Sequence, residues 1–266
     1  MAIHQTALVD PDARLEEGVS IGPYAVVEGG VSIGRGTEVR AHAVIKRFTS
    51  LGQGNVVHEG AVLGGEPQDV AFAGGESYLL IGDGNRIREG VTIHRASKSG
   101  AATTVGSGCF LMAYAHVAHD CAVEDGAILA NNVALAGHVR IGAKAFLSGG
   151  VVVHQFSRVG RLAMVGGNAK VIQDCLPFVV TDGVPARARA VNVVGLRRAG
   201  VGLATTRALR EAYRTLLRSG LPLAAAVEAL AASGEPLVRE LAEFARSSPR
   251  GFSHAAAGAA GGETGG

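Results

Sequence analysis

Four of the nine histidines fall in one stretch of the chain, at His116, His119, His138 and His154, and Asp120 directly follows the second of them. An imidazole titrates near neutral pH, so it can take a proton from a hydroxyl nucleophile. Several imidazoles on one surface can also bind zinc. A third interpretation is structural, with the same side chains forming hydrogen bonds to the backbone at the surface. The residue types alone leave all three open.

The spacing of these residues predicts that they share one edge of the fold. His119, Gly137 and Gln155 follow one another at intervals of 18 residues, and His138 and His154 lie one residue to either side of that series. In a solenoid with 18 residues per coil, all of them would lie on one edge over three coils. A neutral histidine oriented by a neighbouring carboxylate could then act as a general base. The backbone N–H near the glycine could stabilise an oxyanion, since glycine permits close approach.

An aliphatic residue at every sixth position supports this 18-residue coil. The series runs without a break from Ile3 to Leu63, resumes in the same frame at Ile81, and continues after a second break to Val171. An amphipathic helix needs apolar residues at every third or fourth position, so a bare period of six indicates short strands joined by tight corners. Three hexapeptides per coil give a triangular prism with coils about 4.8 Å apart. The sequence therefore predicts a mainly β fold, a parallel β-helix over residues 1–177.

Several segments depart from the period. Residues 64–80 and 94–104 interrupt it, are rich in Gly, Ser and Ala, and are expected to leave the prism as loops. Residues 178–195 are expected to form a connector, and the spacing becomes helical over residues 196–250, which predicts a C-terminal α-helical region. Residues 251–266 are of low complexity and are expected to be disordered.

Composition argues against several classes of function. A net charge of +2 gives no global field for nucleic acid, so no such partner is expected. No stretch reaches the roughly 18 apolar residues of a membrane span, and the first residues lack a signal-peptide pattern, which predicts a cytoplasmic protein. Cys109, Cys121 and Cys175 form no CxxC pair and are expected to be buried thiols. Neither a phosphate loop nor a dinucleotide motif is present, so no cofactor is expected.

Seven motifs in a fixed order resemble the hexapeptide-repeat family of UDP-N-acetylglucosamine O-acyltransferases. They are QDVAFAGG (68–75), RIREGVTIHR (86–95), LMAYAHVAHDC (111–121), ILANNVALAGHV (128–139), VHQFSRVG (153–160), MVGG (164–167) and VNVVGLRRAG (191–200). The resemblance covers roughly residues 3–250, and AHVAHD together with LAGHV and VHQF is its most specific part. It implies a left-handed β-helix and a homotrimer with active sites between subunits. The implied reaction transfers a 3-hydroxyacyl chain from acyl carrier protein to the 3-hydroxyl of UDP-N-acetylglucosamine, the first step of lipid A biosynthesis.

The same resemblance implies roles for individual residues. His119 matches the family's general base, Asp120 lies beside it, and Gly137 matches the glycine of the oxyanion hole. The substrate-binding positions line the cleft or contact the sugar, the nucleotide or the pantetheine, and they are Gln68, Asp69, His94, His116, His138, His154, Gln155, Asn192 and Arg198.

Gly167 matches the position that limits how deep the acyl chain can reach. A glycine leaves the groove open, so the resemblance predicts a relatively long 3-hydroxyacyl donor, and a plain turn glycine is the alternative. Three positions depart from the family pattern, because Ala71, Val194 and Ala199 stand where charged residues are common. These departures affect contacts with the nucleotide and leave the reaction class intact.

Alternatives to this function remain. The acceptor could be an amino-sugar nucleotide acylated at nitrogen, or the chain could be another hexapeptide acyltransferase. An alternative of a different class is a zinc protein similar to carbonic anhydrase, whereas the acyltransferase interpretation requires no metal. A basic run in the helical region could dock the acidic carrier protein through complementary charge. It consists of Arg197, Arg198, Arg207, Arg210, Arg214 and Arg218.

Overall fold

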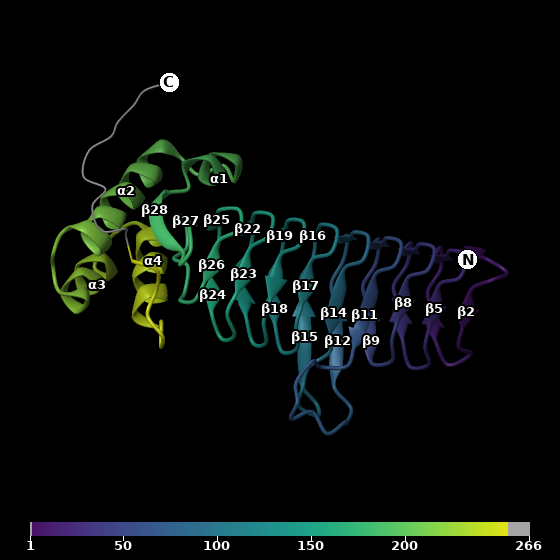
Figure 1. Ribbon diagram of the computed structural model, residues 1–266. Helices are drawn as coiled ribbons and strands as arrows, with labels where there is room; N and C mark the ends of the chain where they lie inside the picture. Colours follow the sequence, from purple (N-terminus) through teal and green to yellow (C-terminus); the bar gives the residue numbers. More distant parts are fainter. Residues whose placement is uncertain (1, 255–266) are drawn as a thin grey trace.

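The protein is a long β-prism that ends in a group of helices (Figure 1). The computed structural model describes residues 2–254. Within these residues, no helix combines the length and the apolar character needed to cross a membrane. The helices are α1 (Val193–Arg198), α2 (Leu203–Arg218), α3 (Leu223–Ala231) and α4 (Pro236–Arg246).

Three sheets form the faces of the prism, and most of their strands are two residues long. Sheet A contains β1 (Ala2–Ile3), β4 (Ser20–Ile21), β7 (Glu38–Val39), β10 (Val56–Val57), β13 (Arg86–Ile87), β16 (Phe110–Leu111), β19 (Ile128–Leu129), β22 (Phe146–Leu147), β25 (Met164–Val165), β27 (Val179–Asp182) and β28 (Arg187–Val191). Sheet B contains β2 (Leu8–Val9), β5 (Val26–Val27), β8 (Val44–Ile45), β11 (Val62–Gly65), β14 (Thr92–His94), β17 (His116–Val117), β20 (Ala134–Leu135), β23 (Val152–Val153) and β26 (Lys170–Val171). Sheet C contains β3 (Arg14–Leu15), β6 (Ser32–Ile33), β9 (Thr49–Leu51), β12 (Tyr78–Ile81), β15 (Ala102–Val105), β18 (Ala122–Val123), β21 (Arg140–Ile141) and β24 (Arg158–Val159).

Each prism strand pairs in parallel with the strand three places later, so three strands make one coil. The usual register joins positions that are one predicted coil apart, as where Val26 pairs with Val44. Two coils contain more residues than the usual coil, because the chain leaves the prism within each of them. One lies between β10 and β13, where Val56 pairs with Arg86, and the other lies between β14 and β17. Both excursions follow a strand of sheet B and return to a strand of sheet C, and they lie within the two segments predicted as loops, whose ends belong to strands β11, β12, β14 and β15.

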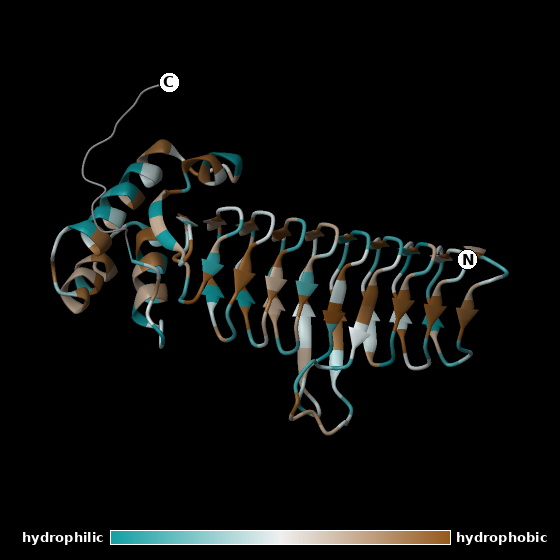
Figure 2. Cartoon of the chain, viewed as in Figure 1, coloured by the Kyte–Doolittle hydropathy of each residue, from teal (hydrophilic) through white to brown (hydrophobic). Residues whose placement is uncertain are grey.

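The aliphatic residues of the six-residue period fill the interior of the prism. Figure 2 shows hydrophobic residues recurring in the strands along the prism. From Ile21 to Val171 every one of these side chains is at most 4% exposed, which confirms the predicted core. Ile3 is 47% exposed because the first coil has a neighbouring coil on one side only. The three cysteines are buried and free, as expected.

Regular structure occupies the segment 178–195, which the sequence suggested was a plain connector. β27 and β28 form an antiparallel hairpin that extends sheet A beyond β25, and α1 begins at Val193. The outward positions of β28 carry Arg187 and Arg189. The hairpin therefore lacks the apolar six-residue period that marks the other strands.

Residues 251–254, expected to belong to a disordered tail, are instead packed on the fold. Phe252 is 1% exposed and forms a parallel bridge with Asp174. Its aromatic ring offers enough apolar area to fix this end of the chain despite the low-complexity sequence that follows. The rest of the expected disordered tail, residues 255–266, lies outside the described residues.

Arg158 joins the prism to the helical region. Its guanidinium donates hydrogen bonds to the Asp174 carboxylate (Nε–Oδ2 2.8 Å), the Phe244 carbonyl (3.1 Å) and the Ser248 hydroxyl (2.8 Å). It also lies 4.2 Å from the centroid of the Phe244 ring. Asp174 is 1% exposed and accepts a further bond from the Arg158 N–H.

We expect Asp174→Ala to lower the free energy of unfolding by about 2 kcal/mol, because Arg158 would keep its charge and lose its carboxylate. The figure is below that for a fully buried pair because the Arg158 side chain is 23% exposed. Chemical denaturation would measure it. Glu243→Ala is the control, since it removes the exposed ion pair with Arg246 and should cost well under about 1 kcal/mol. Equal losses in the two variants would contradict this role.

Candidate active site

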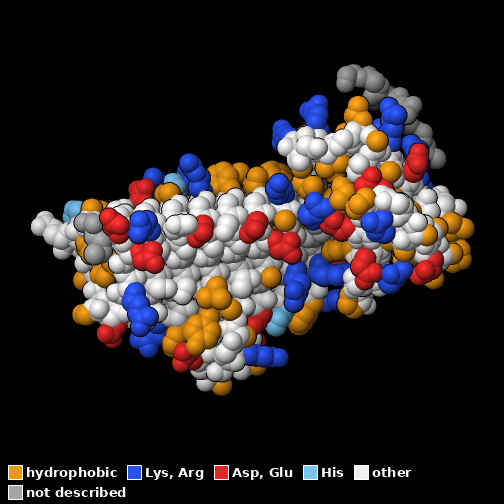
Figure 3. Space-filling model, turned by 180° about the vertical axis from the view of Figure 1, so that it is seen from behind, with side chains coloured by type: hydrophobic (Ala, Val, Ile, Leu, Met, Phe, Trp, Pro, Cys, Tyr) orange, Lys and Arg blue, Asp and Glu red, His pale blue; other side chains and the backbone are white. Residues whose placement is uncertain are grey.

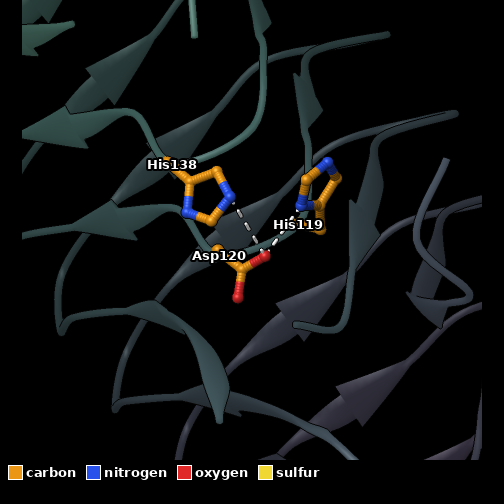
Figure 4. Close-up of side chains that lie close together, drawn as sticks. All are labelled: His119, Asp120 and His138. Atoms are coloured by element: carbon orange, nitrogen blue, oxygen red, sulfur yellow. Dashed lines mark hydrogen bonds and ion pairs between the residues drawn. The ribbon is translucent and has the colours of Figure 1, made fainter. Parts of the chain in front are cut away.

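The predicted catalytic residues lie in the corners between sheets B and C. His119 and Asp120 follow β17, Gly137 and His138 follow β20, and the next coil places His154 and Gln155 after β23. The three coils are stacked directly on one another, because Leu135 pairs with both Val117 and Val153. Figure 4 shows His119 and His138 on either side of the Asp120 carboxylate. The regular spacing therefore did bring these histidines to one edge.

His119 and Asp120 form a close, largely buried pair. His119 Nδ1 lies 2.7 Å from Asp120 Oδ2, and the two side chains are 13% and 11% exposed. Burial opposes ionisation of Asp120, but hydrogen bonds from Ser97 and His119 outweigh it and hold the pKa of this carboxyl below its ordinary value. The ionised carboxylate keeps the His119 proton on Nδ1 and leaves Nε2 free to accept another.

Two residues of the second loop region hold Asp120 in place, and sequence reasoning missed both. Ser97 donates to Asp120 Oδ2 from its hydroxyl (2.7 Å) and from its N–H (3.2 Å), and the Asp120 N–H donates to the Thr103 hydroxyl (2.8 Å). The Asp120 backbone is left-handed, with φ of 59°, which L-residues seldom adopt. These contacts fix a strained corner and aim its carboxylate at His119. This segment departs from the six-residue period, so the pattern does not identify Ser97 and Thr103 as partners of Asp120.

Gly137 lies directly against the His119 ring. A Cβ at this position would lie 2.6 Å from His119 Cε1 and 2.7 Å from Nε2, closer than van der Waals contact allows. The absence of a side chain therefore makes room for the imidazole and exposes the backbone beside Nε2. Among the described residues, the Gly137 N–H donates no hydrogen bond, so it is available to an oxyanion.

His94 and His116 form a second pair beside the first. His116 lies on β17, the strand that precedes His119, and His94 lies one coil below, at the end of β14. Their rings meet edge to face with centroids 5.2 Å apart, and His116 Nδ1 lies 2.7 Å from the Thr92 hydroxyl. Burial, together with the neighbouring His94 and His119, lowers the pKa of His116 to about 4, and burial also lowers the pKa of His94. His94 Nδ1 is buried and finds no hydrogen-bond partner within residues 2–254. Both rings are therefore neutral at physiological pH.

Because of His116, the free energy of unfolding should decrease as the pH falls. Its folded-state pKa of about 4 lies below the unfolded value of 6.5, so the unfolded chain binds the proton first as the pH falls. This stability is complete above about pH 6.5 and is lost as the pH drops towards 4. We expect the melting temperature of His116→Gln to fall less between pH 7.5 and 5 than that of the wild type. A thermal scan would test this, with the exposed His42→Gln as control, and parallel losses in all three proteins would contradict it.

His138 and the coil above it form the upper part of the site. His138 Nε2 lies 3.7 Å from Asp120 Oδ2, and its ring stacks on Phe156 with centroids 4.6 Å apart. His154 and Gln155 are exposed, and Arg250 reaches them from the C-terminal end, donating to the Gln155 carbonyl at 3.2 Å. Phe156 follows His138 by 18 residues, so the predicted coil length already implies this stacking, whereas the sequence pattern does not predict that Arg250 reaches this edge.

Gln68 and Asp69 occupy the first loop, which leaves the same edge of the prism between β11 and β12. Gln68 is exposed, and the Asp69 carboxylate accepts the N–H of Ala71 at 2.9 Å. The described contacts do not join either residue to the histidines. Arg95, 4% exposed, anchors this loop by donating to the Gly75 carbonyl at 2.7 Å. Its burial was not foreseen.

Asn192 and Arg198 lie away from the histidines of the same chain. They line a pocket of about 620 Å³ between α1 and the outer surface of sheet A, together with Phe146, Met164 and Val180. The Asn192 side chain caps α1 by accepting the Gly195 N–H (3.0 Å) and donates to the Leu162 carbonyl (2.9 Å). The oxygen and the nitrogen of this amide therefore each already have one hydrogen-bond partner, whereas Arg198 forms no ion pair within residues 2–254.

Gly167 also lies on a different edge from His119. It follows β25 in the corner between sheets A and B, and it is exposed. A Cβ there would meet only the Gly149 carbonyl at 3.5 Å and Ser148 Cβ at 4.0 Å. A side chain at this position would therefore project outward without strain.

Two groups of side chains within residues 2–254 could approach a metal ion. One is His119, Asp120 and His138, but Asp120 Oδ2 already accepts the Ser97 and His119 hydrogen bonds that a cation would displace. The other is His58 with Glu59 and Glu89. There the Arg40 guanidinium lies 3.1 Å from His58 Nδ1, and its charge opposes a second cation. The donor sets therefore fit a proton-transfer site better than a metal centre.

Known proteins resemble this chain along most of its length. The model for domain 2 of UDP-N-acetylglucosamine O-acyltransferase matches residues 174–253, and the bacterial transferase hexapeptide model matches residues 12–47 and 102–137. An acyl-[acyl-carrier-protein]–UDP-N-acetylglucosamine O-acyltransferase of Janthinobacterium is 43% identical over 257 residues, covering 94% of this chain and 98% of the relative. The protein of the same name from Gloeothece citriformis is 48% identical over 202 residues, 76% of this chain and 73% of the relative.

Solved structures agree with this match. LpxA from Acinetobacter baumannii superposes with a TM-score of 0.92 at 37% identity, covering 96% of this chain and all of that one. The UDP-N-acetylglucosamine O-acyltransferase from Moraxella catarrhalis gives the same TM-score at 39% identity and the same coverage. The predicted fold class, a left-handed parallel β-helix with C-terminal helices, is confirmed. The chain belongs to the UDP-N-acetylglucosamine O-acyltransferase family of hexapeptide-repeat acyltransferases.

Proposed function

We propose that this protein transfers a 3-hydroxyacyl chain from acyl carrier protein to the 3-hydroxyl of UDP-N-acetylglucosamine, the first step of lipid A biosynthesis. The observation that carries the proposal is the Asp120–His119 pair, whose free Nε2 faces the open backbone at Gly137. Family membership supplies the substrates, because the named relatives are acyl-[acyl-carrier-protein]–UDP-N-acetylglucosamine O-acyltransferases.

The pair can perform the transfer by general-base catalysis. The acceptor hydroxyl gives its proton to His119 Nε2 while its oxygen attacks the thioester carbonyl carbon. The Gly137 N–H donates to the oxyanion that develops, and Asp120 stabilises the imidazolium. The C–S bond then breaks, the leaving sulfur takes the proton back from Nε2, and an ester and a free thiol result. The acyl group is already activated as a thioester, so the proposal needs no cofactor beyond the donor's own pantetheine.

The active enzyme is proposed to be a homotrimer. Gly167 lies on another edge of the prism than His119, and Asn192 and Arg198 lie at α1 over sheet A, so a neighbouring chain would be needed to bring them to His119. Exposed apolar side chains on the prism, among them Val152 and Leu80, would be covered in that contact. Light scattering during gel filtration would test this, and a monomer with full activity would overturn it. The substrates and the buried free cysteines support a cytoplasmic location.

Donor length should depend on Gly167. Replacing it by methionine is expected to shift the preferred donor to shorter chains, with a loss of about tenfold or more for the longest ones, because a side chain would close the groove. Ala41→Met is the control, since it occupies the same corner position several coils away. Competition between 3-hydroxyacyl carrier proteins of different lengths, read by mass spectrometry, measures the shift. If Gly167→Met keeps the preferred donor length of the wild type, Gly167 does not limit the acyl chain and is a plain turn glycine.

The proposed reaction is tested with purified protein, 3-hydroxyacyl carrier proteins and UDP-N-acetylglucosamine, with product mass as the readout. A mono-acylated sugar nucleotide that forms equally well in the presence of a chelator is the expected result. Product with an amino-sugar nucleotide only would favour N-acylation instead. Loss of activity on chelation, restored by zinc, would favour the metal-dependent alternative at His119, Asp120 and His138.

A further inference from the structure

Four arginines surround a pocket on the helical region that the proposed reaction does not use. Arg189 comes from β28, and Arg210, Arg214 and Arg218 lie four residues apart along one face of α2, which packs on β28. The pocket has a volume of about 360 Å³. Figure 3 shows Lys and Arg side chains gathered at the helical end of the molecule.

These arginines lack acidic partners. Within residues 2–254, none of the four guanidinium groups forms an ion pair or donates a hydrogen bond, whereas Arg158, Arg161 and Arg246 in the same region are all paired. Four like charges on one pocket repel one another, which costs stability unless an anion offsets them. The residues that line this pocket offer no carboxylate.

A buried tyrosine supplies a second, independent observation. Tyr213 lines the same pocket and is 6% exposed, yet its hydroxyl has no hydrogen-bond partner of ordinary geometry among the described residues. The Arg218 guanidinium lies 5.6 Å from the centroid of its ring. A buried hydroxyl without a partner is costly, so native proteins usually satisfy it, often with a ligand or an ordered water.

We infer that this pocket binds a phosphate group, held by Arg189, Arg210, Arg214 and Arg218 and by a hydrogen bond donated from Tyr213. Guanidinium groups match the geometry of phosphate oxygens and bind them in pairs, and a tyrosine hydroxyl can donate to a further oxygen. A carboxylate ligand would leave more of the four positive charges unbalanced than a phosphate dianion.

The position of the pocket links it to the site region. Val191 and Val193 line it, while Asn192 and Val194 line the pocket between α1 and sheet A. The two pockets therefore lie on opposite sides of one short segment. The phosphate could come from a free phosphate compound or from the prosthetic group of the carrier protein.

Calorimetric titration of the whole protein with inorganic phosphate, at constant ionic strength, tests the site directly. We expect saturable binding that weakens about tenfold or more in Arg210→Gln/Arg214→Gln and several-fold in Tyr213→Phe. Arg207→Gln, on the same helix and not lining the pocket, should bind as tightly as the wild type. Absence of saturable binding, or an equal loss in Arg207→Gln, would overturn the inference.

Thermal stability separates a binding role for Tyr213 from a structural one. Without phosphate, Tyr213→Phe should be at least as stable as the wild type, because it removes an unsatisfied hydroxyl. With phosphate, the wild type should gain more in melting temperature than the variant. A variant already destabilised without phosphate would mean that the hydroxyl serves the fold, and would contradict its assignment as a ligand.

Donor kinetics identify the source of the phosphate. If the prosthetic group supplies it, Arg210→Gln should raise the KM of an acyl-phosphopantetheine donor and leave that of the acyl-pantetheine donor unchanged. If a free phosphate compound supplies it, neither KM should change, and the site then rests on the phosphate titration alone. An equal rise for both donors would contradict phosphate recognition. The phosphate titration does not depend on the proposed reaction, so the two can fail separately.

Discussion

His119→Ala should lower kcat by about 10²- to 10⁴-fold with little change in the fold. The reason is the arrangement around one carboxylate: Asp120 holds the His119 proton on Nδ1 and leaves Nε2 as the base. The variant keeps the prism intact because His119 lies in an outward corner and its neighbour Val117 carries the core contact. Initial rates with saturating acceptor, together with circular dichroism, would measure both effects.

Controls make the His119 result specific. His42→Ala, a histidine in a corner between sheets A and B, should keep wild-type activity. Asp120→Asn should also reduce kcat, since an amide can present its N–H instead of an acceptor and favour the wrong tautomer of His119. An active His119→Ala enzyme would rule out this histidine as the base and move attention to His138.

Gly137→Ala should be almost as damaging as loss of the base, with kcat lower by about 10²-fold. Its Cβ would lie 2.6 Å from His119 Cε1, so the ring would have to shift away from its present position. Displacement of a catalytic group by about 1 Å can cost this much. Since Gly137 does not have a positive φ, backbone strain adds nothing, and the melting temperature should change little.

The matched control for Gly137 is Gly29. It occupies the same position of a corner between sheets B and C, five strand pairings away, and its Cβ would meet only the flexible Asp10 carboxylate at 3.1 Å. Gly29→Ala should therefore leave both kcat and stability unchanged. A full-rate Gly137→Ala enzyme would mean that His119 does not need its observed position. A matching loss in Gly29→Ala would instead point to a general defect of the prism.

The sequence predicted the prism and the catalytic edge because both follow from one period. A side chain in every sixth position must point inward, and residues one coil apart must stack, which places His119, Gly137 and Gln155 in one column. The six-residue period predicts no side-chain positions where the chain departs from it. Ser97 and Arg95, which hold Asp120 and the first loop, lie in such a segment.

The sequence pattern also does not predict which hydrogen bonds individual side chains form. Asn192 is expected to contact the nucleotide or the pantetheine, and its amide also caps α1 and bonds to Leu162, because a helix start leaves N–H groups that need acceptors. The unpartnered Tyr213 hydroxyl depends on how α2 packs on β28, which periodicity does not describe. Long-range packing therefore decided what the local sequence left open.

One measurement tests the central claim most directly, the position of the acyl group in the product. Two-dimensional NMR of the purified product should place an ester on the 3-oxygen of the sugar, with the H3 proton shifted downfield and the original N-acetyl group retained. Such a product follows from a hydroxyl activated by His119 Nε2. An acyl group joined through an amide nitrogen, or no acylated sugar nucleotide at all, would contradict the account.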